Sequence, residues 1–350
     1  MTSTTVVSVD PRADARWHRL ARRDDAHLFI SPNWIAATCD TYGFRPEARI
    51  ALGPDGEPLA GLAWVHLRDM RGERCISLPF CDRADPVGSD PQTWRSMTDD
   101  VIADVPAVPF SIRALEGSVI ESDDRFVPVG EAAWHGTVLG DSVEALHSRL
   151  SSMARRNIVT AERNGLRIEV RADVEAVRTF HRLHLQLRKH KYQLLAQPIE
   201  LFDRIWAGFA PTDAIRTVLA YHDDRPIAGA VYIVWNDVLY YKFGASLREH
   251  LSLRPNELLM WHAMQFGIER KLRMLDWGLS DLDQPGLVAY KRKWASTERR
   301  ITSFRTAGGP AEHEVDAGRV LGRLTELLTD ERVPDDISQR AGEILYRYFC

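Results

Sequence analysis

Three consecutive stretches decide the fold: VLYYKFGAS (238–246), LRPNELLMWHAMQFGIERKLRMLDWGLSD (253–281) and GLVAYKRKWASTERRITSF (286–304). The first predicts a β-strand over 238–245, and the second a helix from Pro255 followed by a strand over 274–278. The third predicts a short helix and a last strand over 297–304. A strand, a helix and a strand in succession imply a right-handed crossover in a parallel or mixed sheet.

The start of the central helix is marked by Arg254-Pro255. Proline has no N–H, and the first helical turn leaves that donor unpaired in any case. Asn256 and Glu257 then lie at the positive end of the helix dipole. Gly267, in the middle of the apolar run, costs about 1 kcal/mol relative to alanine, so we expect another part of the chain to pack closely against it.

Length and composition are those of a globular protein: 350 residues, 45% hydrophobic and 27% charged, with a net charge of −4. We expect one large or two medium domains from the length. The net charge of −4 does not favour DNA binding. No membrane-spanning segment is expected, because no apolar run reaches about 18 residues. The four cysteines show neither a CxxC pair nor metal-ligand spacing, which favours buried thiols and a reducing, cytoplasmic location.

An internal repeat indicates two copies of one αβ unit. RIALGPDGEPLAGLAWVHL (49–67) and RTVLAYHDDRPIAGAVYIVW (216–235) each read as a strand, a turn and a second strand built on Ala-Gly. A generic β-hairpin could produce part of this match. We predict an α/β (α+β) fold with an N-terminal domain over 1–140, a C-terminal domain over 141–308 carrying the chemistry, and a helical extension over 309–350, joined by a linker at TAGGPAEHE (306–314).

Further helices are expected over 141–164 and 173–192, and in the extension over 315–329 and 334–348. The helix over 173–192 ends in Arg188-Lys189-His190-Lys191-Tyr192, which either complements the helix dipole or forms an anion site. Common catalytic motifs are absent: there is no GxSxG, Walker A, HExxH or strand-coupled GxGxxG. His181 and His184 have no third ligand placed by the sequence, so no metal site is expected.

Several motifs in order resemble the GNAT acyltransferase superfamily, and within it the FemXAB-like branch (FemAB-related, BioF2-like acetyltransferase domains). The matching pieces are FISPNWIAAT (29–38), SLPFCDRADPVG (77–88), MARRNIVTAERNGLRIEV (153–170), PIAGAVYIVWNDVLYYKFGAS (226–246), RPNELLMWHAMQFGIERKLRMLDWG (254–278) and AYKRKW (289–294). The resemblance implies two tandem GNAT-like domains, each a mixed twisted sheet flanked by helices. It also implies transfer of an aminoacyl group from aminoacyl-tRNA to an amine, with no bound cofactor.

One loop bears on the donor. GNAT enzymes that use acyl-CoA hold its pyrophosphate on a glycine-rich loop whose N–H groups open the central helix. Here that loop is His250-Leu251-Ser252-Leu253-Arg254-Pro255-Asn256, with no glycine and with a proline that removes a donor. The loop therefore disfavours a standard CoA site and leaves tRNA as the expected partner.

The resemblance also assigns roles to residues. Lys291 matches the lysine of the family's Phe-Lys-x-x-Phe motif and would stabilise negative charge during acyl transfer; a surface cation is the alternative. Tyr241 resembles an aromatic that lines the cleft, with Tyr240 and Lys242 on the opposite side by strand alternation. Asp82 matches a cleft carboxylate that could accept the amine proton, although it could equally cap a turn. The expected substrate-binding residues are Arg188, Tyr192, Tyr290, Trp294, Arg292, Lys293, Arg254 and Asn256.

The sequence departs from the peptidoglycan branch in one respect, since the lysine that grips the acceptor's diphosphate has no counterpart in a first half without lysine. The acceptor could be a small amine, a peptide, an antibiotic intermediate or a sugar amine. Three hypotheses remain: an aminoacyl-tRNA-dependent transferase, an acyl-CoA-dependent N-acyltransferase, and a non-catalytic GNAT-like binding module. The first would be favoured if the basic residues Arg155, Arg156, Arg188, Lys189, Lys191, Lys291, Arg292 and Lys293 gathered on one face.

Overall fold

The structure is a computed structural model that describes residues 4–88, 90–306 and 312–350. The chain divides into two compact units, and each is described by itself. The first contains residues 1–134, 299–319 and 350, and the second contains 135–298 and 320–349. The domain limits expected from the sequence, near Gly140 and residue 308, remain a prediction. Part of the expected linker, 307–311, lies outside the described residues.

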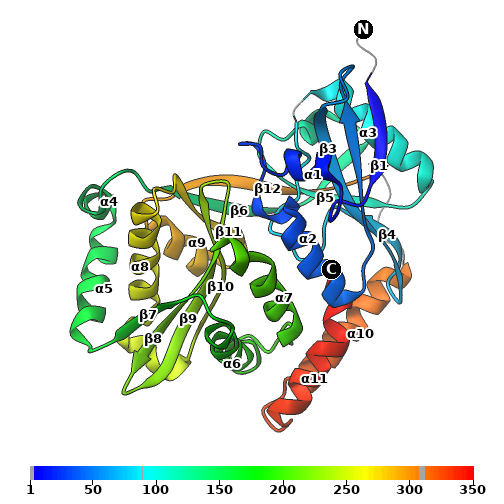
Figure 1. Ribbon diagram of the computed structural model, residues 1–350. Coiled ribbons are helices and arrows are strands. Elements are labelled where there is room, and N and C mark those ends of the chain that lie inside the picture. Colours follow the sequence, from blue (N-terminus) through cyan, green and yellow to red (C-terminus); the bar gives the residue numbers. More distant parts are fainter. Residues whose placement is uncertain (1–3, 89, 307–311) are drawn as a thin grey trace. The chain divides into compact units, whose positions relative to one another are not determined.

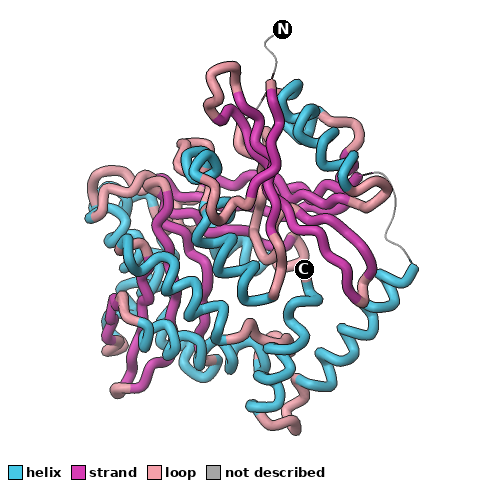
Figure 2. The backbone as a smooth tube through the Cα atoms, turned by 45° about the vertical axis from the view of Figure 1, so that its right-hand side comes forward, coloured by secondary structure: helices cyan, strands magenta, loops and turns pink. Residues whose placement is uncertain are grey.

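The first unit is a mixed sheet with helices on both faces (Figures 1 and 2). Its strand order is β1-β2-β3-β4-β5-β12-β6. The strands are β1 (Thr5–Val9), β2 (Pro46–Leu52), β3 (Pro58–Asp69), β4 (Gly72–Ile76), β5 (Phe110–Leu115), the first part of β6 (Phe126–Val138) and most of β12 (Thr297–Thr306). The helices are α1 (Ala15–Leu20), α2 (Pro32–Tyr42) and α3 (Pro91–Asp104), with short 3₁₀ turns at Leu28–Ile30 and Val119–Ser122.

In the second unit the strand order is β6-β11-β10-β9-β8-β7. The strands are β7 (Arg167–Arg171), β8 (Ile215–His222), β9 (Arg225–Trp235), β10 (Val238–Ser246) and β11 (Met274–Asp281), beside the end of β6. The helices are α4 (Val143–Arg149), α5 (Ser152–Arg163), α6 (Val174–His190), α7 (Ile199–Phe209), α8 (Pro255–Glu269), α9 (Pro285–Arg292), the end of α10 (Glu312–Leu328) and α11 (Asp335–Leu345). The 3₁₀ turns are Ala210–Thr212, η4 (Arg248–Leu253) and Tyr346–Phe349.

Several helices begin at a side-chain cap. The expected helix over 141–164 is two helices instead, because the chain is extended at Leu150 and Ser151, and the Ser151 hydroxyl accepts the Ala154 N–H to start α5. In α6 the cap is Asp173, whose carboxylate accepts the Ala176 N–H at 3.1 Å.

The internal repeat is present in the backbone register. In the hairpin β2–β3, Ala51 pairs with Ala60; in β8–β9, Ala220 pairs with Ala228. Both hairpins carry an irregularity at the residue after the first alanine of the pair, and in each unit a helix then leads to a parallel strand pair, β4–β5 and β10–β11. The two units are therefore built on one plan, as the internal repeat in the sequence predicted.

In the Ala-Gly pair of each hairpin, the glycine faces one helical layer of the unit and the alanine faces the other. A Cβ at Gly61 would lie 2.8 Å from the Trp17 ring of α1, and one at Gly229 would lie 3.2 Å from the Phe180 ring of α6. Successive residues of a strand face opposite sides, so the flanking alanines face the other layer. In the second unit this places α6 and α7 on one face of the sheet and α8 on the other (Figure 1).

Close packing at Gly267 is confirmed, since a Cβ there would lie 2.4 Å from Leu139. The last strand, β12, pairs antiparallel with β5, from Ile301 opposite Leu115 to Arg305 opposite Ser111. The first unit is therefore completed by residues that come after residues 135–298 of the second unit in the sequence.

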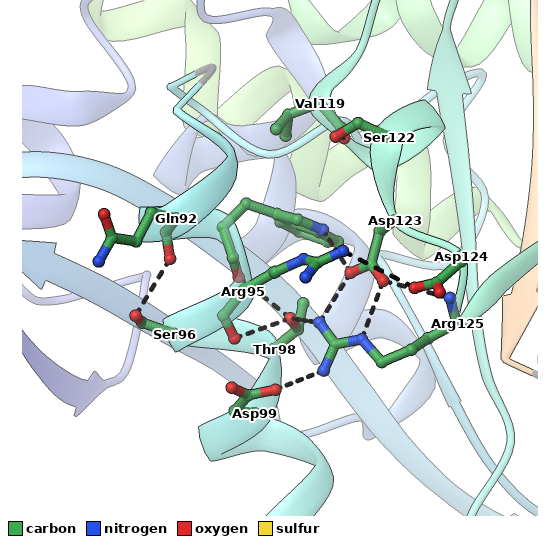
Figure 3. Close-up of polar contacts among 11 residues, drawn as sticks. Gln92, Arg95, Ser96, Thr98, Asp99, Val119, Ser122, Asp123, Asp124 and Arg125 are labelled. Carbon is green, nitrogen blue, oxygen red and sulfur yellow. Dashed lines mark hydrogen bonds and ion pairs between the residues drawn. The ribbon is translucent and has the colours of Figure 1, made fainter.

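A polar network anchors α3 to the segment that follows Val119–Ser122 (Figure 3). The Asp123 carboxylate is buried, accepts the Trp94 indole N–H at 2.8 Å, and pairs with the Arg125 guanidinium at 2.7 Å. Arg125 also donates to the Thr98 hydroxyl at 2.6 Å and to Asp99. Burial alone would raise the pKa of the Asp123 carboxyl, but the bonds from Arg125 outweigh it and the pKa is lowered.

Candidate active site

The strands β10 and β11 part in the middle of the second unit. Their parallel pairing runs only from Val238 opposite Met274 to Tyr240 opposite Asp276, whereas β10 continues along β9 as far as Ser246. Tyr241 is the first residue of β10 beyond this pairing. Both strands thus have residues past the junction with no partner in the other strand, and the candidate site lies at this point.

A β-bulge in β10 changes which residues face which side. The register shifts between Tyr241, opposite Tyr232, and Phe243, opposite Val231, so Lys242 is the extra residue. Tyr241 packs with the core on the α8 side, whereas Phe243 packs on Phe202 of α7, with ring centroids 4.7 Å apart. The bulge therefore places Phe243 on the face opposite Tyr241, where regular alternation would have put both residues on one face.

Aromatic rings surround Tyr241. Its centroid lies 5.6 Å from Tyr232 and 6.2 Å from Trp277 of β11. Burial, together with the nearby Tyr192 phenol, raises the pKa of Tyr241. The phenol therefore stays protonated and can act as a hydrogen-bond donor.

Lys291 lies in the last turn of α9 and is 3% exposed. Its ammonium donates to the carbonyls of Gly278 at 3.1 Å and Leu279 at 3.0 Å, both in the part of β11 beyond the junction. Gly278 has a φ of +68°, and its N–H donates to Asp276 Oδ1 at 2.7 Å. Lys291 is thus a buried cation at the site and not a surface charge.

At the start of α8 lies a buried ion pair that the sequence did not reveal. Glu257, 6% exposed, accepts from the Lys293 ammonium at 3.0 Å and from the Asn157 amide of α5 at 3.2 Å. The Lys293 ammonium also lies 4.1 Å from the centroid of Tyr290. Burial raises the pKa of Tyr290 well above its usual value. The helical position of Glu257 was visible in the sequence, but its partner, 36 residues away, was not.

The loop before α8, which contains no glycine, is a 3₁₀ turn followed by one left-handed residue. Residues 248–253 form the 3₁₀ turn η4, Arg254 is left-handed with a φ of 63°, and Pro255 begins the helix. The Asn256 amide donates to the Ser246 hydroxyl at 3.3 Å.

The other expected binding residues fall into different settings. Arg188 is half-buried and donates through Nε to the Leu195 carbonyl at 3.0 Å, while Tyr192 is exposed. Arg292 is exposed and forms an ion pair with Glu298 at 2.6 Å. Trp294 is fully buried in the hydrophobic core, so it supports the site from behind.

The basic residues expected to form a face are not all on the surface. Lys189 is 5% exposed and its ammonium is bound to Asp335 of α11 at 2.7 Å. Lys189 and Lys291 are both buried and Lys293 is engaged by Glu257, so an electrostatic surface can draw only on the remaining five: Arg155, Arg156, Arg188, Lys191 and Arg292.

Asp82 lies in the first unit, in the loop after β4. Two residues just before it, Leu78 and Phe80, have φ values of 48° and 58°, which are costly for side chains of this size. The Arg113 guanidinium holds this loop by donating to the Cys81 carbonyl at 3.1 Å. The strained backbone supports a functional interpretation of the loop, which the sequence alone left equal to a turn cap.

His181 and His184 have structural partners. Both contact Gln197: His181 Nε2 is 3.0 Å from its carbonyl and His184 Nε2 is 2.7 Å from its side-chain oxygen. Burial lowers the pKa of His181 and lowers that of His184 to about 3. Among the described residues, no group of three His, Cys, Asp or Glu side chains could hold a metal ion.

The four cysteines form no disulfide, and Cys39, Cys75 and Cys81 are buried. Burial raises the pKa of Cys75 to about 12. Within the described ranges, no helix is long and apolar enough to cross a membrane.

Residues 148–292, which hold β10, β11, Tyr241 and Lys291, match the family described as "Acetyltransferase (GNAT) domain". They are a GNAT domain. No curated protein matches the chain. The domain carries an acyltransferase fold, as the sequence predicted.

Solved structures extend the similarity over both units. FemX is similar at a TM-score of 0.67 with 14% identity, covering 85% of this chain and 96% of that one. A tandem GNAT protein from the clavulanic acid biosynthesis pathway has a TM-score of 0.56 and 11% identity, covering 89% of this chain and 100% of the other. The C-terminal domain of a putative lysylphosphatidylglycerol synthetase from Agrobacterium fabrum has a TM-score of 0.53 and 14% identity, with coverages of 84% and 91%. The predicted FemXAB-like, tandem GNAT fold is confirmed.

Proposed function

We propose that this protein transfers an aminoacyl group from aminoacyl-tRNA to the amine of a small molecule or peptide, forming an amide bond. The observation that carries this choice of donor is the buried Glu257–Lys293 pair at the start of α8. An acyl-CoA diphosphate would use the positive end of this helix, but a carboxylate of the chain already lies there and engages the nearest ammonium. Pro255 removes one further donor.

In the proposed reaction, the amine nitrogen attacks the ester carbonyl carbon of the donor. The new C–N bond forms, the ester C–O bond breaks, and the ribose hydroxyl leaves with a proton. We assign Lys291 the role of stabilising the negative charge that develops on oxygen, because a buried ammonium acts strongly where water is excluded. Tyr241 orients the acyl group, and the amine proton passes to the leaving ribose oxygen.

The remaining residues hold the substrates in this proposal. Arg188 and Tyr192 lie at the end of α6, and Arg254 and Asn256 at the start of α8, where they would contact the ends of the donor or acceptor. Tyr290, Arg292 and Lys293 lie in the last turn and at the C-terminal cap of α9, and Trp294 follows them in the buried core.

The test is a binding titration of the purified protein with a pool of charged tRNA at several salt concentrations, and separately with acetyl-CoA and longer acyl-CoA esters. We expect salt-sensitive tRNA binding, weakened by reversing the charge of Arg292, with Arg204→Glu, an exposed residue of α7, as the matched control. Transfer of a labelled aminoacyl group to a panel of amines should then be lost in Lys291→Gln. Stabilisation by a CoA ester without affinity for tRNA would instead establish the N-acyltransferase.

A second variant tests the argument about α8 directly. Glu257→Gln removes the carboxylate that we regard as excluding a diphosphate. If acetyl-CoA binds the native protein as tightly as it binds Glu257→Gln, the carboxylate has no such effect and the stated reason for preferring tRNA is wrong.

A further inference from the structure

A pocket of about 690 Å³ lies in the second unit, between one face of α6, the start of β9, and the turn that follows β10. Its lining includes the buried side chains of Leu183 and Leu247, with Pro226 half-buried beside them. Polar and charged side chains form the rest of the wall. No residue of the pocket comes from α8, β11 or α9, but the pocket adjoins the site described above, because Ser246 in its wall accepts a hydrogen bond from Asn256.

The charged side chains of this pocket are mostly positive. Arg182 and Lys191 come from α6 and its C-terminal cap, Arg225 is the first residue of β9, and Arg248 is the first residue of η4. Glu249 is the only carboxylate in the lining. All five side chains belong to exposed residues. This excess of cations stands out in a protein whose net charge is −4.

These four cations also lack the partners that other cations of the same unit have. Arg171, Arg178 and Arg216 each form an ion pair with an aspartate of the chain. Across the residues that the structure describes, Arg182, Lys191, Arg225 and Arg248 form no ion pair; Arg182 donates to the Thr179 hydroxyl at 2.8 Å, and the Lys191 ammonium lies 4.9 Å from the Tyr192 ring centroid. Such a group of like charges is held together at a cost that an incoming anion removes.

We propose that this pocket binds the phosphate groups of a small organic di- or triphosphate. Arginine presents a planar fork of donors that matches phosphate oxygens in pairs, and three of the four cations are arginines. The volume is within the range of small-ligand sites, and the apolar floor suits a ring or sugar next to the phosphates. A single carboxylate would leave most of the four cations without a partner.

The site extends beyond the transfer reaction proposed above and does not rest on it. Ser246, at the pocket, and Tyr241, at the strand junction, lie on the same strand five residues apart, roughly 15 Å at the usual rise. A ligand anchored here by its phosphates therefore sits beside the acyl-transfer site without occupying it.

The experiment is isothermal titration of the full-length protein with inorganic pyrophosphate, with ADP and with a tRNA acceptor-stem minihelix. One variant combines Arg182→Gln with Arg225→Gln, and a second carries Arg248→Glu. The control combines Arg178→Gln with Arg204→Gln, which removes two exposed arginines of α6 and α7 that are outside the pocket. Unfolding curves of all variants establish that each is folded.

We expect pyrophosphate and ADP to bind at low salt with a Kd below about 1 mM, and the pocket variants to weaken both by about tenfold or more. The control should bind within about threefold of the native protein. Equal binding by native and pocket variants, or no binding of pyrophosphate and ADP, overturns the proposal. Binding of the minihelix alone, lost in the pocket variants, also overturns it and reassigns the pocket to RNA.

Discussion

The hydroxyl of Tyr241 occupies the space that a side chain at Gly244 would need. An ideal Cβ on Gly244 would lie 1.7 Å from the Tyr241 Oη and 2.6 Å from Cζ. The bulge after Tyr241 brings the glycine under the ring. We predict that Gly244→Ala displaces Tyr241, destabilises the protein by about 1 to 3 kcal/mol, and lowers transfer activity. Denaturant unfolding and the transfer assay measure the two effects.

A matched control is Gly322→Ala in α10, where an added Cβ meets nothing within 4 Å. That change should stabilise the helix by about 0.5 to 1 kcal/mol. In a Tyr241→Ala background, Gly244→Ala should cost little, because the clashing ring is gone. If it costs the same with and without the ring, the contact between the two residues is not the cause.

Lys291 should contribute separately to stability and to the proposed catalysis. Lys291→Met leaves the carbonyls of Gly278 and Leu279 without this buried donor, at a cost of about 1 to 3 kcal/mol. The conservative variant Lys291→Arg keeps the positive charge that Lys291→Met removes, and it serves as the comparison. We expect transfer to fall about 100-fold or more in Lys291→Met at a temperature where the variant is folded.

The comparison that separates the two contributions is a thermal ramp alongside the transfer assay. A folded Lys291→Met variant with native transfer activity would refute the catalytic role and leave the residue as a structural link between α9 and β11.

The buried His184 predicts a loss of stability in mild acid. Its pKa is about 3 in the folded protein, against about 6.5 in an unfolded chain, because burial disfavours the charged ring. Between these values the unfolded state binds more protons, so stability falls as the pH drops from 6.5 toward 3, by on the order of 4 kcal/mol. Urea unfolding of His184→Asn at several pH values should show a shallower fall in stability than that of the native protein.

Asp123 predicts a second acid-dependent term in the first unit. The pKa of its carboxyl is lower in the folded protein than in the unfolded chain, where it is near 4. Its bonds to Arg125 and Trp94 therefore stabilise the fold fully above about pH 4, and this stability is lost as the pH falls through the pKa of the folded state. Asp123→Asn should destabilise the protein by about 1 to 3 kcal/mol at pH 7.

The check on Asp123 is urea unfolding at pH 7 and in steps toward pH 3. The control is Asp124→Asn, since the Asp124 side chain is 91% exposed and its ion pair with Arg95 is long, at 3.7 Å. The difference between Asp123→Asn and the native protein should narrow as the pH falls. A constant difference across that range would show that the charge of Asp123 is not what stabilises the fold.

Much of the fold was predictable because its signals are local. Pro255 begins α8, Asp173 caps α6, and the Ala-Gly pairs mark equivalent strands in both units. Lys291 and Tyr241 were singled out because the segments AYKRKW and VLYYKFGAS resemble motifs of the family.

What the sequence could not supply depends on partners far apart in the chain. The burial of Lys189 requires Asp335, 146 residues later, and the Glu257–Lys293 pair links α8 with the end of α9. A bulge leaves no clear mark on strand periodicity, so the change of face between Tyr241 and Phe243 was missed.

The late arrival of β12 has a consequence for biosynthesis. During translation, residues 1–134 leave the ribosome well before residues 299–306, so the edge of β5 that pairs with β12 stays open while residues 135–298 of the second unit are made. An open strand edge is a template for pairing with other chains, and a fragment ending near residue 140 would keep it permanently. This protein is thus most exposed to aggregation while its first unit has been synthesised without β12. The strand that covers the open edge follows residues 135–298 in the sequence.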